Sequence, residues 1–190
     1  IAAVAEYARR FGVRVYVTLN TLLFDDELAD AERIARQVVE AGADALIVQD
    51  MAYLEMELEG VELHASTQTF NASPEKAAFL ADCGFSRVIL ERNLSLEEIR
   101  RIRAATDVEL ECFVHGAICV CYSGRCYMSR TMSPRSGNRG DCMQACRLPY
   151  DLLDAAGNVL MAGKHLLSVR DMDLSGLSMP PCWMPVSTIL

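Results

Sequence analysis

Along the first 114 residues, segments with apolar side chains at helical spacing alternate with short, nearly continuous apolar runs typical of buried strands. Residues 2–11 place apolar side chains at helical intervals, and residues 13–19 that follow are mostly β-branched or aromatic. The same change recurs and predicts five strands, over 13–19, 45–49, 61–66, 87–91 and 108–114. Helices are predicted before and between them, over 2–11, 26–41, 51–58, 74–83 and 96–105, with Ser95 and Glu98 as a capping box for the last. This alternation predicts an α/β fold with a parallel sheet covered on both faces.

Two architectures fit this order of elements, an open doubly wound sheet and a (β/α)8 barrel. No G-x-G-x-x-G follows a predicted strand, which argues against a dinucleotide-binding sheet. In both architectures the carboxyl ends of the strands face the active site. All five predicted strands end on polar residues, namely Thr18–Asn20, Gln49–Asp50, Ser66–Gln68, Glu91–Arg92 and His115–Gly116. Any one of them could be a cap or turn residue, but together they predict a site at one rim.

Composition narrows the class of protein. The 190 residues are 52% hydrophobic, which is enough for a buried core. With 18 basic and 26 acidic residues the net charge is −8, which argues against a domain that holds nucleic acid through a net positive field. No run of eighteen apolar residues occurs, so no membrane span is predicted. Since no export signal precedes the first helix, we expect a cytoplasmic protein.

Six of the eight cysteines fall between residues 112 and 146. Structural disulfides are disfavoured in the cytosol, so this grouping indicates metal, cluster or redox chemistry. Cys119, Cys126, Cys142 and Cys146 have the spacing C-x6-C-x15-C-x3-C. Zinc sites prefer pairs two to four residues apart, and the spacing therefore favours a [4Fe–4S] cluster over zinc.

The same region carries a family resemblance. The run ECFVHGAICVCYSGRCYMS (111–129) resembles the signature of the collagenase-like peptidase family, peptidase family U32. The resemblance continues through NRGDCMQACRLPY (138–150) and, upstream, through YVTLN, ADALIVQD, HASTQ and RVILERNLSLEEIRRI. It implies a TIM-barrel core in which Cys119, Cys126, Cys142 and Cys146 hold a [4Fe–4S] cluster, with Cys121 outside the ligand set.

The resemblance also implies a reaction. The better-defined relatives take part in oxygen-independent or prephenate-dependent hydroxylation of tRNA wobble uridine, of a ribosomal RNA cytidine, or of the ubiquinone ring. This chain is most similar to the RNA branch, so tRNA or rRNA is the expected partner and prephenate an expected co-substrate. Two alternatives are a collagenase-like peptidase acting on a peptide, and an iron–sulfur accessory subunit in quinone hydroxylation with a homologous partner subunit. No H-E-x-x-H or G-x-S-x-G occurs, which makes the peptidase the weaker reading.

Candidate roles follow for a hydroxylase. His115 is the candidate for proton transfer, and Glu91 and Gln68 are the other candidate catalytic residues. Asn20 is expected to bond a ring or base edge, and Arg92 and Arg139 to bind a carboxylate or phosphate, with Arg125 as a weaker candidate. Glu111 is expected to support the cysteine loop, and His64 to be a packing residue.

Four segments make up the expected organisation. Residues 1–114 form five strand–helix units of an incomplete barrel, since a full one has eight strands and about 250 residues. Residues 115–147 form the cysteine-rich cluster loop, and 148–176 a β-hairpin and connector. The tail, 177–190, has three prolines and no charge, and we expect it to come from a reading-frame slip near residue 179.

Overall fold

The computed structural model describes residues 1–174, and these fall into two compact units. The first unit spans Ile1–Phe113 and the second begins at Val114. Each is described by itself below. The predicted tail lies outside the described residues. Within residues 1–174 no helix is long and apolar enough to cross a membrane.

The first unit alternates strands and helices. Its strands are β1 (Tyr16–Leu19), β2 (Ala45–Val48), β3 (Glu62–Ala65), β4 (Arg87–Ile89) and β5 (Glu109–Glu111). Its α-helices are α1 (Ala2–Arg9), α2 (Leu28–Glu40), α3 (Pro74–Asp82) and α4 (Leu96–Ala105), and its 3-10 helices are η1 (Asp25–Glu27), η2 (Met51–Leu54) and η3 (Thr67–Thr69). All five predicted strands are therefore present, each shorter than its apolar run.

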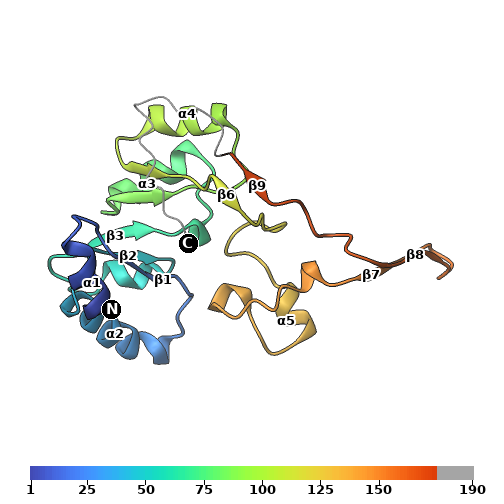
Figure 1. Cartoon of the computed structure of the whole chain (residues 1–190), viewed down its shortest axis with the longest axis horizontal. Coiled ribbons are helices and arrows are strands. Elements are labelled where there is room, and N and C mark those ends of the chain that lie inside the picture. Colours follow the sequence, from blue (N-terminus) through green and yellow to red (C-terminus); the bar gives the residue numbers. More distant parts are fainter. Residues whose placement is uncertain (175–190) are drawn as a thin grey trace. The chain divides into compact units, whose positions relative to one another are not determined.

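The five strands form one parallel sheet in the order β1-β2-β3-β4-β5. Each strand pairs with its neighbour in the chain, so the order of the described strands does not reverse as it does in a doubly wound sheet. Helices α2, α3 and α4 lie on the outer side of the sheet (Figure 1). The predicted α/β class with a parallel sheet is confirmed.

A contact between β1 and β4 shows that this sheet is curved. The Arg87 guanidinium lies 5.2 Å from the centroid of the Tyr16 ring. Neighbouring strands are spaced by about 4.8 Å, so three steps across a flat sheet would separate these strands by roughly 14 Å. A curved sheet accounts for the contact, because side chains converge on its inner face. There Arg87 is 1% exposed and donates to the carboxylates of Glu109 and Glu111.

Local signals explain where the helices begin. Ser95 and Glu98 form the predicted capping box, in which Ser95 Oγ accepts from the Glu98 backbone N–H at 3.3 Å and a Glu98 carboxylate oxygen from the Ser95 N–H at 2.7 Å. The short helix predicted around 51–58 is present only in its first half, as the single 3-10 turn of η2. This segment buries Tyr53 alone, and its acidic residues at 55, 57 and 59 alternate instead of following a helical stripe.

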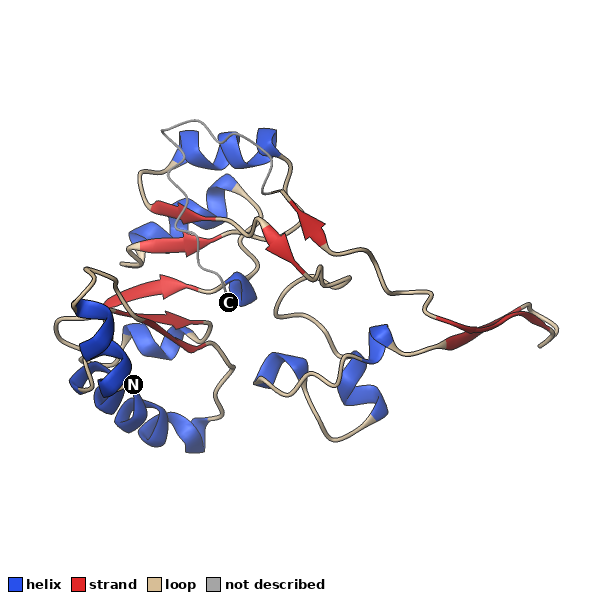
Figure 2. Ribbon diagram, viewed as in Figure 1, coloured by secondary structure: helices blue, strands red, loops and turns tan. Residues whose placement is uncertain are grey.

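The second unit has little regular structure (Figure 2). Its elements are β6 (His115–Gly116), α5 (Met128–Met132), η4 (Gly137–Arg139), η5 (Ala145–Arg147), β7 (Tyr150–Leu153), β8 (Val159–Lys164) and β9 (Met172–Asp173). Strands β7 and β8 form the expected hairpin, whose turn is held by the Asp154 carboxylate accepting the N–H groups of Ala156 and Asn158 at 2.9 Å.

The strand predicted over 108–114 is wrong at its carboxyl end. Strand β5 stops at Glu111, and His115 lies in β6, which pairs antiparallel with β9 in the second unit. An apolar run of Cys112, Phe113 and Val114 follows Glu111 and extends the predicted strand, but the chain leaves the parallel sheet there. His115 therefore does not mark the end of a strand of the five-stranded sheet.

Candidate functional site

The carboxyl ends of β1, β2 and β3 carry a connected set of polar side chains. Asn20 Nδ2 donates to Ser66 Oγ at 3.3 Å, although β2 lies between the strands that these residues follow. At the end of β2, Gln49 Nε2 donates to the backbone carbonyl of Gln68 at 3.3 Å. Gln49 is 7% exposed. The predicted rim is thus a hydrogen-bonded group on the first unit.

The segment after β3 is tightly fixed against β4. Asn71 is fully buried, and its Nδ2 donates to the backbone carbonyls of Ser66 at 2.9 Å and Ile89 at 2.8 Å. Asn71 Oδ1 accepts from the Thr69 hydroxyl at 2.6 Å. Between them, Phe70 adopts a left-handed backbone conformation with φ of 58°. Such a conformation costs about 1–3 kcal/mol in a non-glycine residue and persists only where its surroundings hold it.

Glu91 and Arg92 add charge at the end of β4. Glu91 is 7% exposed, and one of its carboxylate oxygens accepts from the Arg92 backbone N–H at 3.0 Å. The Arg92 guanidinium lies 4.8 Å from the centroid of the Phe113 ring. A guanidinium that stacks on a ring still presents N–H donors along its edge, which suits a carboxylate or phosphate.

The structure distributes the predicted site residues over both units. It places Asn20, Gln68, Glu91 and Arg92 on the rim of the first unit. His115, which is exposed, and Arg139 belong to the second unit. Their proposed roles remain predictions.

Two other acid–base residues of the sequence have structural partners. His64 is fully buried, packs edge-on against the Tyr16 ring at 4.7 Å between centroids, and contacts Glu62 through Nε2 at 3.2 Å. Burial lowers the pKa of His64 most strongly. The hydrogen bond that the Glu62 carboxylate accepts raises this pKa, and the Arg87 charge lowers it. The expectation that His64 is a packing residue is confirmed. Glu111 accepts from Arg87 Nη1 at 3.2 Å, so its partner is the sheet interior and not the cysteine loop as expected.

The second unit folds its cysteines around small polar residues. We use "cysteine module" for residues 119–147, in which Ser123, Ser129 and Asn138 are buried. Asn138 Oδ1 accepts from the Cys126 backbone N–H at 3.3 Å. Cys142 Sγ accepts from the Gln144 N–H at 3.3 Å and from the Ser129 hydroxyl at 3.9 Å. The buried groups therefore orient the cysteines instead of forming an apolar core.

The thiols of the module influence one another. Burial raises the pKa of Cys146, and the neighbouring Cys119, Cys142 and Cys126 raise it further. Burial and the nearby Cys126 and Cys119 likewise raise the pKa of Cys121. Among residues 1–174, however, no three metal-ligating side chains already stand close enough together to hold a metal ion.

The chemistry of the module fits a cluster. Thiolates are soft ligands for iron–sulfur clusters, and N–H donors to sulfur, as at Cys142, are among the groups that tune such sites. Mutual repulsion of thiolates is relieved when they share a cation. Within the described part of the second unit, Ala145 is the one buried apolar residue, so hydrophobic burial contributes little to its order.

Three important residues are missed by the sequence reasoning above or given no role by it. Gln49 and Asn71 shape the rim, and Arg147 ties the module together. Arg147 donates to the backbone carbonyl of Ile118 at 2.9 Å, to that of Val169 at 3.0 Å and to the Ser168 hydroxyl at 2.8 Å. In the sequence, the sign of a role for Arg147 is its position next to Cys146. In the structure its side chain reaches Ile118, the residue before Cys119.

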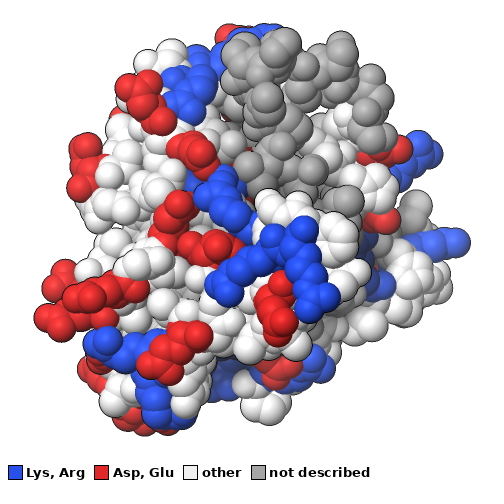
Figure 3. Space-filling view, turned by 60° about the vertical axis from the view of Figure 1, so that its left-hand side comes forward, with Lys and Arg blue, Asp and Glu red and all other residues white. Residues whose placement is uncertain are grey.

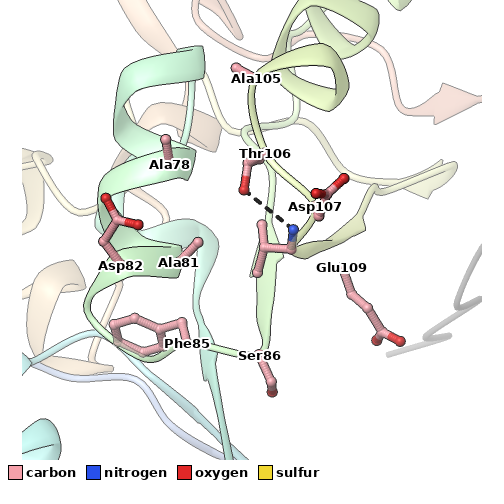
Figure 4. Close-up of a pocket in the computed structure, with 10 residues that line it drawn as sticks. Ala78, Ala81, Asp82, Phe85, Ser86, Ala105, Thr106, Asp107 and Glu109 are labelled. Atoms are coloured by element: carbon pink, nitrogen blue, oxygen red, sulfur yellow. Dashed lines mark hydrogen bonds between the residues drawn. The ribbon is translucent and has the colours of Figure 1, made fainter.

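A pocket of about 500 Å³ lies away from the rim, between α3 and α4 (Figure 4). It is lined by Asp82, Phe85, Asp107 and Glu109 among others, at the amino ends of β4 and β5. Its one drawn hydrogen bond joins the Val108 N–H to Thr106 Oγ1 at 3.3 Å and stabilises the turn. Ligands of parallel α/β sheets bind at the carboxyl ends of the strands, so the rim is the better candidate.

Charge is mixed on the face that Figure 3 shows. In Figure 3, Lys and Arg side chains lie among Asp and Glu side chains, in keeping with the net charge of −8. Recognition of an anionic ligand would therefore depend on individual arginines and not on a broad positive field.

Together these features define an α/β protein with a polar rim at the carboxyl ends of a curved parallel sheet, followed in the chain by a cysteine-built unit. The model of peptidase family U32 matches residues 1–177. The chain belongs to peptidase family U32, and the family resemblance of its motifs is confirmed.

Known proteins resemble the chain over most of its length. It is 53% identical over 173 residues to the 23S rRNA 5-hydroxycytidine C2501 synthase of Escherichia coli, covering 91% of this chain and 26% of that protein. It is 35% identical over 183 residues to tRNA hydroxylation protein P1 of Bacillus subtilis, covering 92% and 43%. The chain thus spans less than half the length of these relatives. The solved structure of the U32 peptidase Mk0906 shares the fold, with a TM-score of 0.54 and 17% identity over 88% of this chain and 71% of that one.

Proposed function

We propose that this chain is part of an enzyme that hydroxylates a pyrimidine of RNA. The observation that carries the proposal is the 53% identity, over 91% of the chain, to an rRNA 5-hydroxycytidine synthase. The similarity to a tRNA hydroxylation protein supports the same class of reaction. The expected substrate is a ribosomal RNA cytidine, with a tRNA wobble uridine as the next candidate.

We also propose that the five strands are a segment of a (β/α)8 barrel. The sequential strand order and the Tyr16–Arg87 contact, which a curved sheet accounts for, support this assignment. In such a barrel the carboxyl ends of the strands form the catalytic face. The rim of Asn20, Gln49, Gln68 and Glu91 then lies where substrate binds.

The cysteine module is proposed to hold a [4Fe–4S] cluster through Cys119, Cys126, Cys142 and Cys146. When bound, such a cluster supplies one-electron transfer and cross-links the loop. The chain's own contribution is to orient the ligands. The N–H of Gln144 and the hydroxyl of Ser129 bond Cys142, and Arg147 fastens the chain on both sides of the module.

The rim residues are proposed to bind and orient substrates. Arg92, stacked on Phe113, would take a carboxylate of the hydroxyl donor, for which prephenate is the candidate, or an RNA phosphate. Asn20, Gln68 and Glu91 would hydrogen-bond the base. His115 and Arg139 belong to the second unit, and their expected roles in proton transfer and anion binding stay predictions for that unit by itself.

Proteolysis is less well supported by the side chains. Burial raises the pKa of Cys112 to about 11, which keeps this thiol protonated and poorly nucleophilic at neutral pH. The cysteines of the module have a separate role as ligands. No histidine of residues 1–174 is hydrogen-bonded to a cysteine, so no Cys–His pair supports a nucleophile.

One comparison tests the proposed function. Nucleosides of ribosomal RNA and tRNA from a strain lacking the complete gene are compared with those of its parent by mass spectrometry. We expect a hydroxylated pyrimidine to disappear in the deletion strain and to return when the gene is restored. Unchanged RNA, together with loss of gelatin or collagen cleavage, would establish the peptidase instead.

A further inference from the structure

Two buried side-chain atoms within the described part of the chain have no hydrogen-bond partner, Oε1 of Gln49 and Nδ1 of His64. His64 lies inside the sheet among Tyr16, Glu62 and Arg87, where its surroundings are structural. Gln49 lies at the rim. An unpaired buried acceptor costs about 1–3 kcal/mol, so its presence at a candidate site calls for a donor that arrives with a ligand.

The orientation of the Gln49 amide is set by its neighbour. Its Nε2 donates to the backbone carbonyl of Gln68 at 3.3 Å, and this carbonyl can only accept. Exchanging the two ends of the amide would bring two oxygens together. The unpaired atom is therefore a carbonyl oxygen, and it accepts a hydrogen bond but cannot donate one.

The neighbouring polar side chains already have partners. The Asp50 carboxylate accepts from the N–H groups of Leu23 at 2.9 Å and Ala52 at 3.0 Å. The Asn71 amide is used on both its nitrogen and its oxygen. The Asn20–Ser66 bridge crosses the end of the strand that Gln49 follows. The rim thus holds Gln49 Oε1 as a buried acceptor in a hydrogen-bonded frame, and a ligand must enter this frame to reach it.

We infer that Gln49 recognises the target base by accepting a hydrogen bond from the 4-amino group of a cytosine. This inference rests on the proposed function and adds the base that the site selects. Cytosine presents an N–H donor at position 4, whereas uracil presents an oxygen acceptor there. A fixed carbonyl oxygen attracts the first and repels the second. Anchoring the 4-amino group also places the adjacent carbon 5 of the ring, the position named in the rRNA relative, at the rim.

Binding of matched RNAs to the protein encoded by the complete gene tests this recognition. Three synthetic RNA hairpins differ in one unpaired loop base, which is cytosine, uracil, or pyrimidin-2-one, a cytosine without its amino group. We expect the unmodified protein to bind the cytosine hairpin roughly tenfold more tightly than either of the others, the worth of about one hydrogen bond. This arm needs no variant, so it does not depend on a substitution being tolerated.

The variant Gln49→Met removes the acceptor while keeping the length of the side chain. We expect it to bind all three hairpins alike, at the weaker affinity, with unchanged iron and sulfide content. Gln37→Met is the matched control, because Gln37 is exposed on α2, and it should keep the tenfold preference. Equal binding of the three hairpins by the unmodified protein, a preference for uracil, or a preference that survives Gln49→Met would overturn the inference.

Restoring the deletion strain separates this inference from the proposed function. If the unmodified gene restores no hydroxylated pyrimidine, the proposed function fails. If it restores 5-hydroxycytidine and the Gln49→Met gene restores the same amount, the inference alone fails. We expect the variant to restore at most about a tenth of the modification when protein is limiting.

Discussion

The two units of this chain are stabilised in different ways. Of the twenty buried apolar residues among residues 1–174, nineteen lie in the first unit and one, Ala145, in the second. The first unit buries all four residues of β2 under its helices, whereas the hairpin strand β8 of the second unit is exposed along its whole length. An isolated two-stranded hairpin is marginal in water.

This difference indicates which interactions hold each unit in its folded structure. The first unit is ordered by hydrophobic burial, and its buried polar side chains lie at the rim and on the inner face of the sheet. The second unit relies on side-chain hydrogen bonds and on its thiols, which repel one another when they ionise. Loss of a ligand cysteine should therefore affect the second unit alone, and loss of a core side chain the first alone.

The largest effect is expected from removing a proposed ligand. Cys142→Ala and Cys146→Ala should each abolish the brown absorbance and the iron and sulfide of protein purified without oxygen, because a [4Fe–4S] cluster needs its thiolates. The matched control is Cys83→Ala, which removes a thiol from the first unit. Iron and sulfide content that is unchanged in both ligand variants would refute the ligand assignment.

A core truncation tests the other half of the comparison. Leu80 on α3 is fully buried, and Leu80→Ala should lower the free energy of unfolding of the first unit by about 3 kcal/mol through lost burial and a cavity. Hydrogen exchange of amides in β2 and β3 along a denaturant titration measures this change in the first unit. Phe79→Ala, at an exposed position next to Leu80, should cost much less. A loss of iron in Leu80→Ala at temperatures where the first unit stays folded would contradict the separation of the two units.

Arg147 provides a smaller, local effect in the second unit. Arg147→Ala leaves the carbonyls of Ile118 and Val169 without this donor, and we expect local opening to become easier by about 2 kcal/mol. Cleavage of the second unit by a protease at limiting concentration should accelerate by roughly thirtyfold, since such cleavage follows the population of the open form. Arg135→Ala, which breaks only an exposed ion pair with Asp141, is the control and should change little. Equal cleavage rates for both variants would show that Arg147 does not hold the module.

The contrast also explains how far the sequence predicts the molecule. Strands and helices of the first unit follow from apolar periodicity, and the Ser95–Glu98 cap from a local motif, because both depend on near neighbours. The partners of Gln49, Asn71 and Arg87 lie 18 to 24 residues away in the chain, and these contacts depend on which strands are neighbours in the sheet. Polar strand ends indicated where the rim lies. The polar strand ends did not show that the side chains of Asp50 and Asn71 have hydrogen-bond partners at both polar atoms, whereas Oε1 of Gln49 has none.

The smallest predicted effect concerns pH and the first unit. His64 is buried with a lowered pKa, so near and below pH 6.5 the unfolded chain takes up a proton more readily than the folded one. The free energy of unfolding should therefore fall as pH drops from 7 to 5, by at most about 1.4 kcal/mol per pH unit. The pKa of Glu62 is lowered, first by its hydrogen bond with His64, so Glu62 acts in the same direction only at still lower pH.

Replacing the imidazole isolates this contribution. His64→Phe keeps an aromatic ring against Tyr16 and removes the titrating group, so the loss of stability between pH 7 and pH 5 should become shallower. His165→Phe, in the second unit, should leave the slope of the first unit unchanged. Since the fluorescence and circular dichroism of both units overlap, the measurement is hydrogen exchange of amides in β2 and β3 across this pH range. A slope that persists unchanged in His64→Phe would contradict the assignment of this pH dependence to His64.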